Sequence, residues 1–447
     1  MSRNACQDFH HASEASRRST FTRRQALRWS LGAGLAVYAQ RAFPFADALD
    51  AAAAEAAGLP DAPILVSVFL PGGLDLLDTI VPVAADGRYR DLRGGIAVNG
   101  VSPLASESAL GLAPALSQGV NDGLRGIFDR GQLGLLPGID YADPNMSHFA
   151  SRVFWETGMV TNQQVSGWLG RWLDRHGSSA NPFQGMTSGY GLSPLLRTAG
   201  APVASMMSPT GLALRMPALE DRDIDYAAQA LAAYGDLGAA AGGSRPGPRA
   251  AAAGVRFAHD IHTRMQPLIG RGAAAFAGPV SYPQNNDTAV RLSNLAAMLA
   301  QPLGIRIGTV EASGGWDTHA NQNGALAHDL GSLSEALSAF QADLEARGLA
   351  DRVLTLVWSE FGRRPTANKS MGTDHGAAGV AWVMGARARS GVLSDYPSLT
   401  DLDANGNMKV TVDFRTVYAS LIAQWLQTDP AEVIPDAKAF GQIGLVA

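Results

Sequence analysis

Cysteine is almost absent from this chain of 447 residues, and its single occurrence is Cys6. One cysteine near the N-terminus excludes a disulfide framework and a zinc site built from thiolates. Any metal ion must therefore be held by oxygen atoms and imidazole nitrogens.

Charged residues are also scarce, at 17%, whereas 46% of the residues are apolar, as expected for a globular protein with a large core. The formal net charge is −5, and because residues 1–48 hold seven Arg, two Asp and one Glu, the remainder carries −9. A mildly acidic body without a basic run argues against a nucleic-acid partner. No segment after residue 48 has the roughly 20 apolar residues of a spanning helix, so we expect no transmembrane span in the mature protein.

The N-terminus has the pattern of an export signal. Residues 22–27 read Thr-Arg-Arg-Gln-Ala-Leu, which resembles a twin-arginine signal, and residues 29–39 form a short apolar run. Residues 46–48, Ala-Asp-Ala, provide a small-residue cleavage site, although a buried helix is the alternative. We expect residues 1–55 to be a signal peptide and disordered linker read by the twin-arginine export machinery, and the protein to be periplasmic or secreted.

The first predicted strand carries a candidate ligand at its end. Residues 63–70 form a nearly continuous apolar run that ends at Pro-Gly-Gly, as in a strand buried on both faces of a parallel sheet. Asp75 follows in the loop, and Asp78 is the alternative. In open α/β sheets, ligands bind at the carboxyl ends of the strands.

A candidate nucleophile lies after the next predicted elements, a helix over 109–130 and a strand over 132–137. Ser147 precedes a predicted helix that ends near residue 157, and His148 is adjacent to it. A serine there is usually an N-cap, yet a helix start also favours an oxyanion or phosphoryl group.

The middle of the chain carries little that predicts a site. Residues 235–254 read as a flexible Ala/Gly/Pro loop, and helices are expected over 254–269 and 288–301. His259 and His262 share one helix face, for which an ordinary polar face is the favoured interpretation.

The last third of the chain alternates strands and helices. Strands are expected over 305–310, 353–358 and 381–384, an amphipathic helix over 322–347, and a final helix after an N-cap at Asp413. Strands alternating with helices predict an α/β fold with a mostly parallel sheet, here in one domain spanning residues 56–447.

Three glycine-containing loops of this region hold acidic, imidazole and guanidinium groups that predict a metal site. With Asp75, the carboxylates would repel one another at the sheet edge unless a cation neutralised them. Oxygen and nitrogen ligands suit one or two ions of Zn²⁺, Mn²⁺, Fe or Mg²⁺, with Ca²⁺ less favoured. Ser147 is the preferred nucleophile over Thr373 and Ser359, and Arg363 or Arg364 would clamp an anion. The loop residues are Asp317, His319, Glu360, Asp374 and His375.

These motifs together resemble the bacterial domain-of-unknown-function 1501 family. The resemblance rests on Leu-Pro-Gly-Gly-Leu-Asp at 70–75, Ser-His-Phe at 147–149, Gly-Gly-Trp-Asp-Thr-His at 314–319, Ser-Glu-Phe-Gly-Arg-Arg at 359–364, Gly-Thr-Asp-His-Gly at 372–376 and Asp-Phe-Arg-Thr-Val-Tyr at 413–418. That family is grouped with the alkaline-phosphatase-like superfamily, which implies a three-layer α/β/α sandwich with a two-metal site. The resemblance assigns Asp75, Asp317, His319, Glu360 and His375 to metal ligands and Ser147 to the nucleophile.

Two departures from the superfamily pattern affect the expected site. Asp317 and His319 are two residues apart rather than four, and Phe361 stands where a histidine would follow the carboxylate. One metal is then lost, or Asp374 replaces the missing ligand. The expected function is an exported metal-dependent hydrolase of phosphate or sulfate esters, acting on a small-molecule or glycan ester. The alternative is a non-catalytic envelope protein of the same fold that binds a metal or a glycan.

Overall fold

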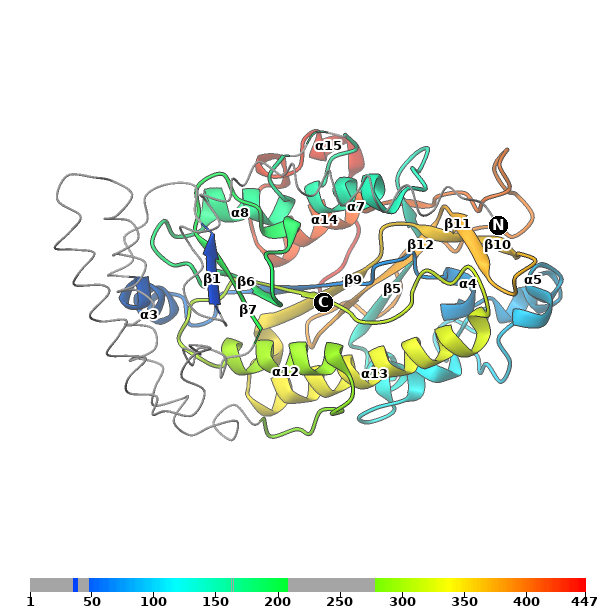
Figure 1. Cartoon of the computed structure of the whole chain (residues 1–447), viewed down its shortest axis with the longest axis horizontal. Coiled ribbons are helices and arrows are strands. Elements are labelled where there is room, and N and C mark those ends of the chain that lie inside the picture. The colour runs from blue at the N-terminus through cyan, green and yellow to red at the C-terminus, as the bar shows by residue number, and fades with distance from the viewer. Residues whose placement is uncertain (1–34, 39–47, 162, 164, 208–277) are drawn as a thin grey trace, which may run out of the picture.

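The computed structural model describes residues 35–38, 48–161, 163, 165–207 and 278–447, which surround one large central sheet (Figure 1). Hydrogen-bonded neighbours follow a single path across the sheet, and one short strand, β14 (Val412–Asp413), joins β5 off this path. The path runs β1 (Leu35–Tyr38), β7 (Val203–Met206), β6 (Gly185–Ser188), β8 (Ile307–Glu311), β2 (Ile64–Phe69), β9 (Val353–Trp358), β12 (Gly379–Met384), β5 (Leu133–Asp140) and β13 (Gly391–Val392).

The sheet is mostly parallel, as the sequence predicts. Strands β7, β6, β8, β2 and β9 run parallel to one another, and all six residues of β2 and of β9 are buried. Strand β1 is antiparallel to β7. Strand β12 is antiparallel to β9 and to β5. The chain between β9 and β12 contains a β-ribbon and no crossover helix, and a parallel return would require such a crossover.

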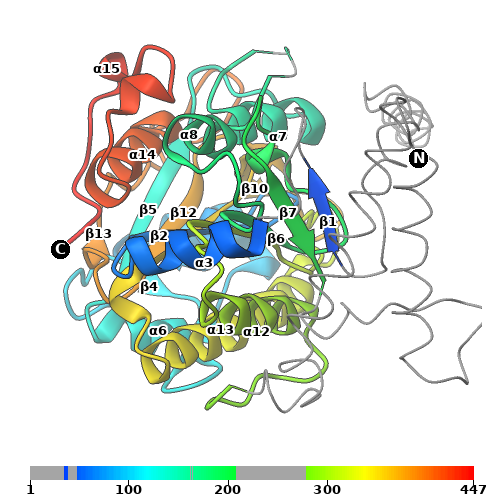
Figure 2. The same ribbon diagram turned by 90° about the vertical axis from the view of Figure 1, so that its left-hand side faces the viewer.

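Helices cover both faces of the sheet and give a three-layer α/β/α fold (Figures 1 and 2). One face is covered by α6 (Gly123–Asp129), α12 (Asp287–Leu299) and α13 (Gln322–Ala346). The other face is covered by α7 (His148–Thr157), α8 (Trp168–His176) and α14 (Phe414–Ser420), which continues as a π-helix over Leu421–Trp425.

The two interfaces between these layers differ in composition. Because side chains alternate along a strand, Val66 and Val68 of β2 pack into the α12/α13 side, whereas Leu65 and Phe69 pack into the α7/α8/α14 side. The first core is mainly aliphatic, and α13 contributes its regularly spaced leucines to it. The second holds stacked rings, including Trp155 against Trp358 at 5.4 Å between ring centroids.

The helix expected over residues 109–130 is wrong. The segment instead contains β4 (Gly111–Leu112), the 3₁₀ helix Pro114–Ser117 and the short helix α6. Asn121 and Asp122 both have positive φ, a conformation that a continuous α-helix does not permit. Strand β4 pairs with β3 (Ile80–Val81) away from the main sheet.

Two loops of the predicted site are strands. β10 (Gly362–Ala367) and β11 (Thr373–Gly376) form an antiparallel ribbon beside the carboxyl ends of β2 and β9 (Figure 1). Two helices follow β2: the short α4 (Leu76–Thr79) and α5 (Asp86–Arg93), which contacts β10. The ribbon therefore projects from the edge of the sheet where the expected site residues gather.

Several sequence predictions fall outside the described residues. These are the twin-arginine-like motif at 22–27, most of the cleavage site at 46–48, the loop 235–254, the helix over 254–269, and His259 with His262. Within the segment expected to be a signal peptide and linker, the described residues form β1 and α3 (Ala48–Gly58). None of the described helices combines the length and apolarity needed to cross a membrane.

Candidate metal centre

Three imidazoles converge on the carboxylate of Asp317. Asp317 and His319 lie in the loop after β8, His375 lies on β11, and His148 is the first residue of α7. The Nε2 atoms of His319 and His375 each lie 3.1 Å from Oδ1 of Asp317, and Nε2 of His148 lies 3.4 Å from Oδ2. Imidazoles and a carboxylate in this arrangement form the usual ligand set of a transition-metal ion.

The outer nitrogen of each imidazole meets an oxygen atom. Nδ1 of His148 lies 2.7 Å from Glu360, Nδ1 of His375 lies 2.8 Å from the carbonyl oxygen of Met146, and Nδ1 of His319 lies 3.3 Å from Asp374. A carbonyl and a carboxylate only accept hydrogen bonds, so each Nδ1 carries the proton. Each Nε2 faces Asp317, where it donates a hydrogen bond when protonated or can offer its lone pair to a cation, as metal-binding histidines do when an outer oxygen fixes their tautomer.

The centre needs protons or a cation. Nε2 of His319 and Nε2 of His375 lie 3.0 Å apart, so a proton or a cation must lie between these two nitrogens. Three carboxylates and the guanidinium of Arg363 contact the imidazoles or one another, and with neutral imidazoles their formal charges sum to −2. Protonated imidazoles or a divalent cation would offset this charge. The carboxylates are those of Asp317, Glu360 and Asp374.

The electrostatics of the metal-free centre are those of a tight ion cluster. Burial disfavours protonation of His148, but hydrogen bonds and charge from Asp317 and Glu360 outweigh it and raise the pKa of His148 to about 9. Burial opposes ionisation of Asp317, yet hydrogen bonds from His148, His375 and Arg363 hold its pKa far below the usual range. The carboxylate is therefore ionised at any physiological pH and ready to bind a cation.

Arg363 holds Asp317 in position. Its guanidinium is fully buried and donates to the carbonyl oxygens of Gly72, Gly73 and Thr373 as well as to Oδ1 of Asp317. Since the side chain has no exposed surface, it does not reach a substrate. The structure thus places Arg363, expected to clamp an anion, in a positioning role.

Two glycines allow the loops to approach closely enough for this arrangement. A Cβ atom added to Gly72 would lie 2.5 Å from the backbone nitrogen of Asp317, and one added to Gly372 would lie 2.3 Å from the carbonyl carbon of His319. Both contacts are with backbone atoms, which do not move aside cheaply. Glycine is required at these two positions because the loop backbones are packed against each other.

Glu360 lies behind the centre. It is buried, and its carboxylate accepts hydrogen bonds from the backbone N–H of Gly72 at 2.9 and 3.0 Å and from Ser359 at 3.0 Å. Its remaining strong contact is with Nδ1 of His148. These hydrogen bonds offset burial and lower the pKa of Glu360. A metal-bound histidine typically meets a carboxylate of this kind, so Glu360 orients His148.

Asp75, expected to be a metal ligand, is located in a different cluster. Its carboxylate forms a two-pronged ion pair with Arg93, with both N–O distances at 2.6 Å, and both side chains are fully buried. It also caps α4 by accepting from the backbone of Leu77 and accepts from Gln322 and Thr373. Its oxygens are therefore already used by donors of the chain.

Asp78, the alternative to Asp75, belongs to the same buried cluster. It accepts hydrogen bonds from Tyr89 at 2.8 Å and from Gln322 at 2.7 Å, and it lies 3.7 Å from Nε of Arg93. Burial is the dominant influence and raises the pKa of Asp78 to about 6 in spite of Arg93.

The candidate nucleophiles differ in accessibility. Ser147 is exposed at the start of α7, next to His148, and its hydroxyl does not cap the helix. Ser359 is buried and donates to the carbonyl oxygen of Leu70, and Thr373 is buried beside Asp75. Arg364, the other expected anion clamp, is exposed on β10.

The centre thus includes one group that sequence reasoning did not assign. His148 was noted only as a neighbour of Ser147, yet with Asp317 and His375 it forms a triad whose ligand atoms lie within 4.8 Å of one another. The usable signal was a histidine in the first turn of a helix, within the Ser-His-Phe motif. Its contact with Asp317 was not predictable, because the two residues lie far apart along the chain.

Comparison with known proteins agrees with the sequence motifs. A search of curated proteins finds no match. Residues 271–437, which include Asp317, Glu360 and His375, match the family model described as "Protein of unknown function (DUF1501)". The matched segment, in the second half of the chain, is thus similar to the family that the motifs at 314–319, 359–364 and 372–376 indicate.

Proposed function

We propose that this protein is a metal-dependent hydrolase of phosphate or sulfate esters, with Ser147 as its nucleophile. The observation that carries the proposal is the convergence of three imidazole Nε2 atoms on Asp317 while each outer nitrogen is held by an oxygen. A site for packing alone has no need of three rings that all turn Nε2 toward one carboxylate.

The cation would be held by His148, Asp317 and His375, with His319 within reach as a further ligand or as a base. Nitrogen-rich sets favour Zn²⁺ or Fe²⁺ over Mg²⁺, which prefers oxygen. When bound, a divalent cation supplies Lewis-acid stabilisation of negative charge on an ester oxygen. Because Asp75 is paired with Arg93, the arrangement supports one ion rather than two.

The start of α7 supplies an anion-binding feature beside the centre. The first backbone N–H groups of a helix have no acceptor within the helix, and the dipole adds positive potential there. Since the Ser147 side chain does not cap them, these groups remain available to a phosphoryl or sulfuryl group. This feature replaces the role that Arg363 was expected to play.

In the proposed reaction, Oγ of Ser147 attacks the phosphorus or sulfur atom and the ester oxygen leaves as an alcohol. His319 accepts the serine proton at Nε2, and Asp374, on its Nδ1, stabilises the resulting imidazolium. The same proton is returned to the leaving oxygen. Water then hydrolyses the serine ester, which releases phosphate or sulfate and restores the hydroxyl.

Metal analysis and hydrolysis of p-nitrophenyl phosphate and p-nitrophenyl sulfate test the proposal. Asp317→Asn should lose both the metal and the activity, whereas Ser147→Ala should retain the metal and lose activity. Ser370→Ala, in the exposed turn between β10 and β11, is the matched control and should change neither. A wild-type protein that binds none of Zn²⁺, Fe²⁺ or Mn²⁺ would contradict the metal centre. Full activity in Ser147→Ala would contradict the nucleophile alone.

The superfamily likeness and the export route are part of the same proposal. Residues 22–27 resemble a twin-arginine signal, and the α/β/α fold is compatible with the alkaline-phosphatase-like grouping. Replacing Arg23 and Arg24 with lysine should retain the protein in the cytoplasmic fraction if this signal is used.

A further inference from the structure

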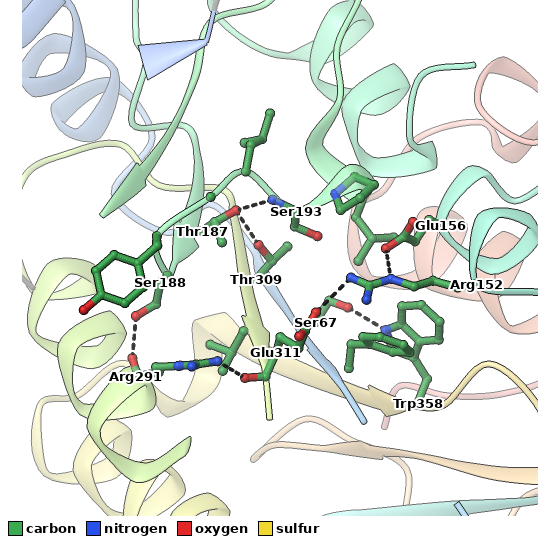
Figure 3. Close-up of a pocket in the computed structure, with 18 residues that line it drawn as sticks. Ser67, Arg152, Glu156, Thr187, Ser188, Ser193, Arg291, Thr309, Glu311 and Trp358 are labelled. Carbon is green, nitrogen blue, oxygen red and sulfur yellow. Dashed lines mark hydrogen bonds and ion pairs between the residues drawn. The ribbon is translucent and has the colours of Figure 1, made fainter. Parts of the chain in front are cut away.

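A cavity of about 260 Å³ lies over the side of the sheet that faces α7 (Figure 3). It is bounded by the ends of β6, β8, β2 and β9, by α7 and by the loop 189–195. Its volume is near the lower end of the roughly 300–1,000 Å³ common for small-molecule sites.

The floor of the cavity is a row of hydroxyl groups on neighbouring strands. Thr187 on β6 pairs with Thr309 on β8, and Thr309 pairs with Ser67 on β2. All three are buried, although the flanking positions of the same sheet face, such as Leu65 and Ile307, are aliphatic. A polar row in a buried apolar face costs free energy unless its hydrogen-bonding groups are used.

This row has hydrogen-bonding capacity left for a ligand (Figure 3). Trp358 donates from Nε1 to Ser67 at 2.9 Å, and among the described residues the hydroxyl hydrogen of Ser67 finds no acceptor. The hydroxyls of Thr187 and Thr309 are 2.9 Å apart, and only one of their two hydrogens can lie between them. The floor therefore presents hydroxyl donors and acceptors to the cavity.

The walls carry balanced charge. Arg152 donates to Glu156 at 2.7 Å and to Glu311 at 2.8 Å, and Arg291 donates to the carbonyl oxygen of Glu311. Two arginines and two glutamates sum to no net charge, so the cavity does not select an anion as a positively charged pocket would. A neutral ligand with many polar atoms fits these walls better than an anion or an aliphatic chain.

The rim offers an aromatic side chain. Tyr190 belongs to the cavity lining between Gly189 and Gly191, and 85% of its surface is exposed. An exposed ring at the mouth of a polar cavity provides a flat apolar face for the C–H groups of a ligand.

Four segments line both the cavity and the metal centre. On α7, Arg152 lies one turn after His148, and on β9, Trp358 precedes Glu360 by two residues. Phe69 at the end of β2 and Glu311 at the end of β8 lead into the loops with Gly72 and Asp317. A ligand in the cavity is therefore held by segments that continue into the metal centre.

We infer that this cavity binds a neutral sugar ring, and that the substrate is a phosphate or sulfate ester of a neutral carbohydrate. The hydroxyl row contacts the sugar hydroxyls, the Arg152 and Glu311 side chains bind its edge, and Tyr190 covers one face. The substrate assignment rests on the proposed function, whereas the sugar binding itself does not.

Titration calorimetry of the mature protein tests the inference with three neutral probes, cellotriose, maltotriose and chitotriose, and with trigalacturonic acid as the anionic probe. At least one neutral probe should bind with a Kd of about 1 mM or tighter. Thr309→Val, which keeps the shape and removes one hydroxyl, should weaken that binding by about 10-fold. Tyr190→Ala, at an exposed position, should weaken it without affecting folding.

Thr355→Val is the matched control. Thr355 is a buried threonine of β9 between Val353 and Val357, which belong to the core on the opposite face. This change should leave the Kd unaltered, as should chelation of the metal or Asp317→Asn. Binding that persists without metal separates the sugar site from the hydrolase proposal.

Three results would overturn the inference. They are no saturable binding of any neutral probe, tighter binding of trigalacturonic acid than of every neutral probe, and an unchanged Kd in both Thr309→Val and Tyr190→Ala.

Discussion

Two clusters of carboxylates lie at the same edge of the sheet, and their negative charge is neutralised in different ways. Around Asp75, the chain supplies its own cation, because Arg93 forms a two-pronged ion pair with it in a fully buried setting. Around Asp317, the nearby groups are mostly imidazoles, and the Asp317 side chain is 44% exposed. The first cluster is closed to solvent and the second is open.

The difference shows that a carboxylate after a parallel strand is not by itself a metal ligand. Gln322 and Thr373 donate to Asp75 in addition to Arg93, so its oxygens have no free capacity. At the open cluster, Nε2 of His319 and Nε2 of His375 face each other at 3.0 Å and share the exposed carboxylate of Asp317. Groups that still need a proton or a cation, rather than the presence of acid groups alone, distinguish a candidate cation site from a closed ion pair.

Replacing the cation of the closed cluster should have the largest effect. Arg93→Met leaves the buried Asp75 carboxylate uncompensated, and we expect a loss of about 3–5 kcal/mol in the free energy of unfolding. Urea unfolding of metal-free protein measures it. Arg90→Met, on the same helix, removes an exposed pair with Asp86 and an exposed hydrogen bond to Asn99, and should cost much less. Equal losses of unfolding free energy in the two variants would contradict the conclusion that Arg93 neutralises the closed cluster.

Removing a ligand of the open cluster should affect metal affinity more than stability. His148→Ala is expected to weaken Zn²⁺ binding by more than about 100-fold, beyond what changes behind a ligand typically cause. Competition with a fluorescent chelator gives the affinity. His176→Ala is the control, because the ion pair of His176 is with the surface carboxylate of Glu432 and lies outside the centre. An unchanged affinity in His148→Ala would remove this residue from the ligand set.

Glu360→Gln should have a smaller effect on the same affinity. Glutamine retains the shape and can still accept from Gly72, but it no longer places a charge on Nδ1 of His148. We expect Zn²⁺ binding to weaken by about 10–100-fold. Glu432→Gln, at the matched surface pair with His176, should not change the Zn²⁺ affinity. A loss as large as that of His148→Ala would make Glu360 a ligand itself.

The smallest predicted effect is a pH dependence of the closed cluster. An unfolded Asp has a pKa of about 3.9, whereas burial raises the pKa of Asp78 to about 6 in the folded protein. Between these pH values the folded state keeps a proton that the unfolded chain has released, so stability contributed at low pH is lost as the pH rises to about 6. Asp78→Asn should flatten this decline. Parallel thermal-unfolding curves against pH for the two proteins would contradict it.

Much of the fold follows from short-range patterns. The apolar runs of β2 and β9 and the leucine spacing of α13 lie within single elements, so the sequence predicts them well. The segment 109–130 was mispredicted because apolar residues recur there while Pro114 and the positive-φ pair Asn121 and Asp122 interrupt any helix. The antiparallel direction of β12 depends on the ribbon before it, which no local periodicity reveals.

The residues of the centre were only partly readable. Glycine loops with adjacent Asp and His pointed to Asp317, His319 and His375, which the structure brings together. The pairing of Asp75 with Arg93, 18 residues later, depends on how α5 packs and leaves no local mark. The contact of His148 with Glu360 spans 212 residues and is equally invisible in the sequence.

The hydrogen bonds of Arg363 also determine when the centre forms during folding. Its guanidinium joins the carbonyl of Gly73, 290 residues earlier, to that of Thr373, only 10 residues later. Contacts with such long sequence separation form late, because closing long loops costs chain entropy that only the finished structure repays. If the centre binds a cation as proposed, a growing chain has no such site until its last third has docked onto the first strand. Metal uptake would then be a direct readout of complete folding.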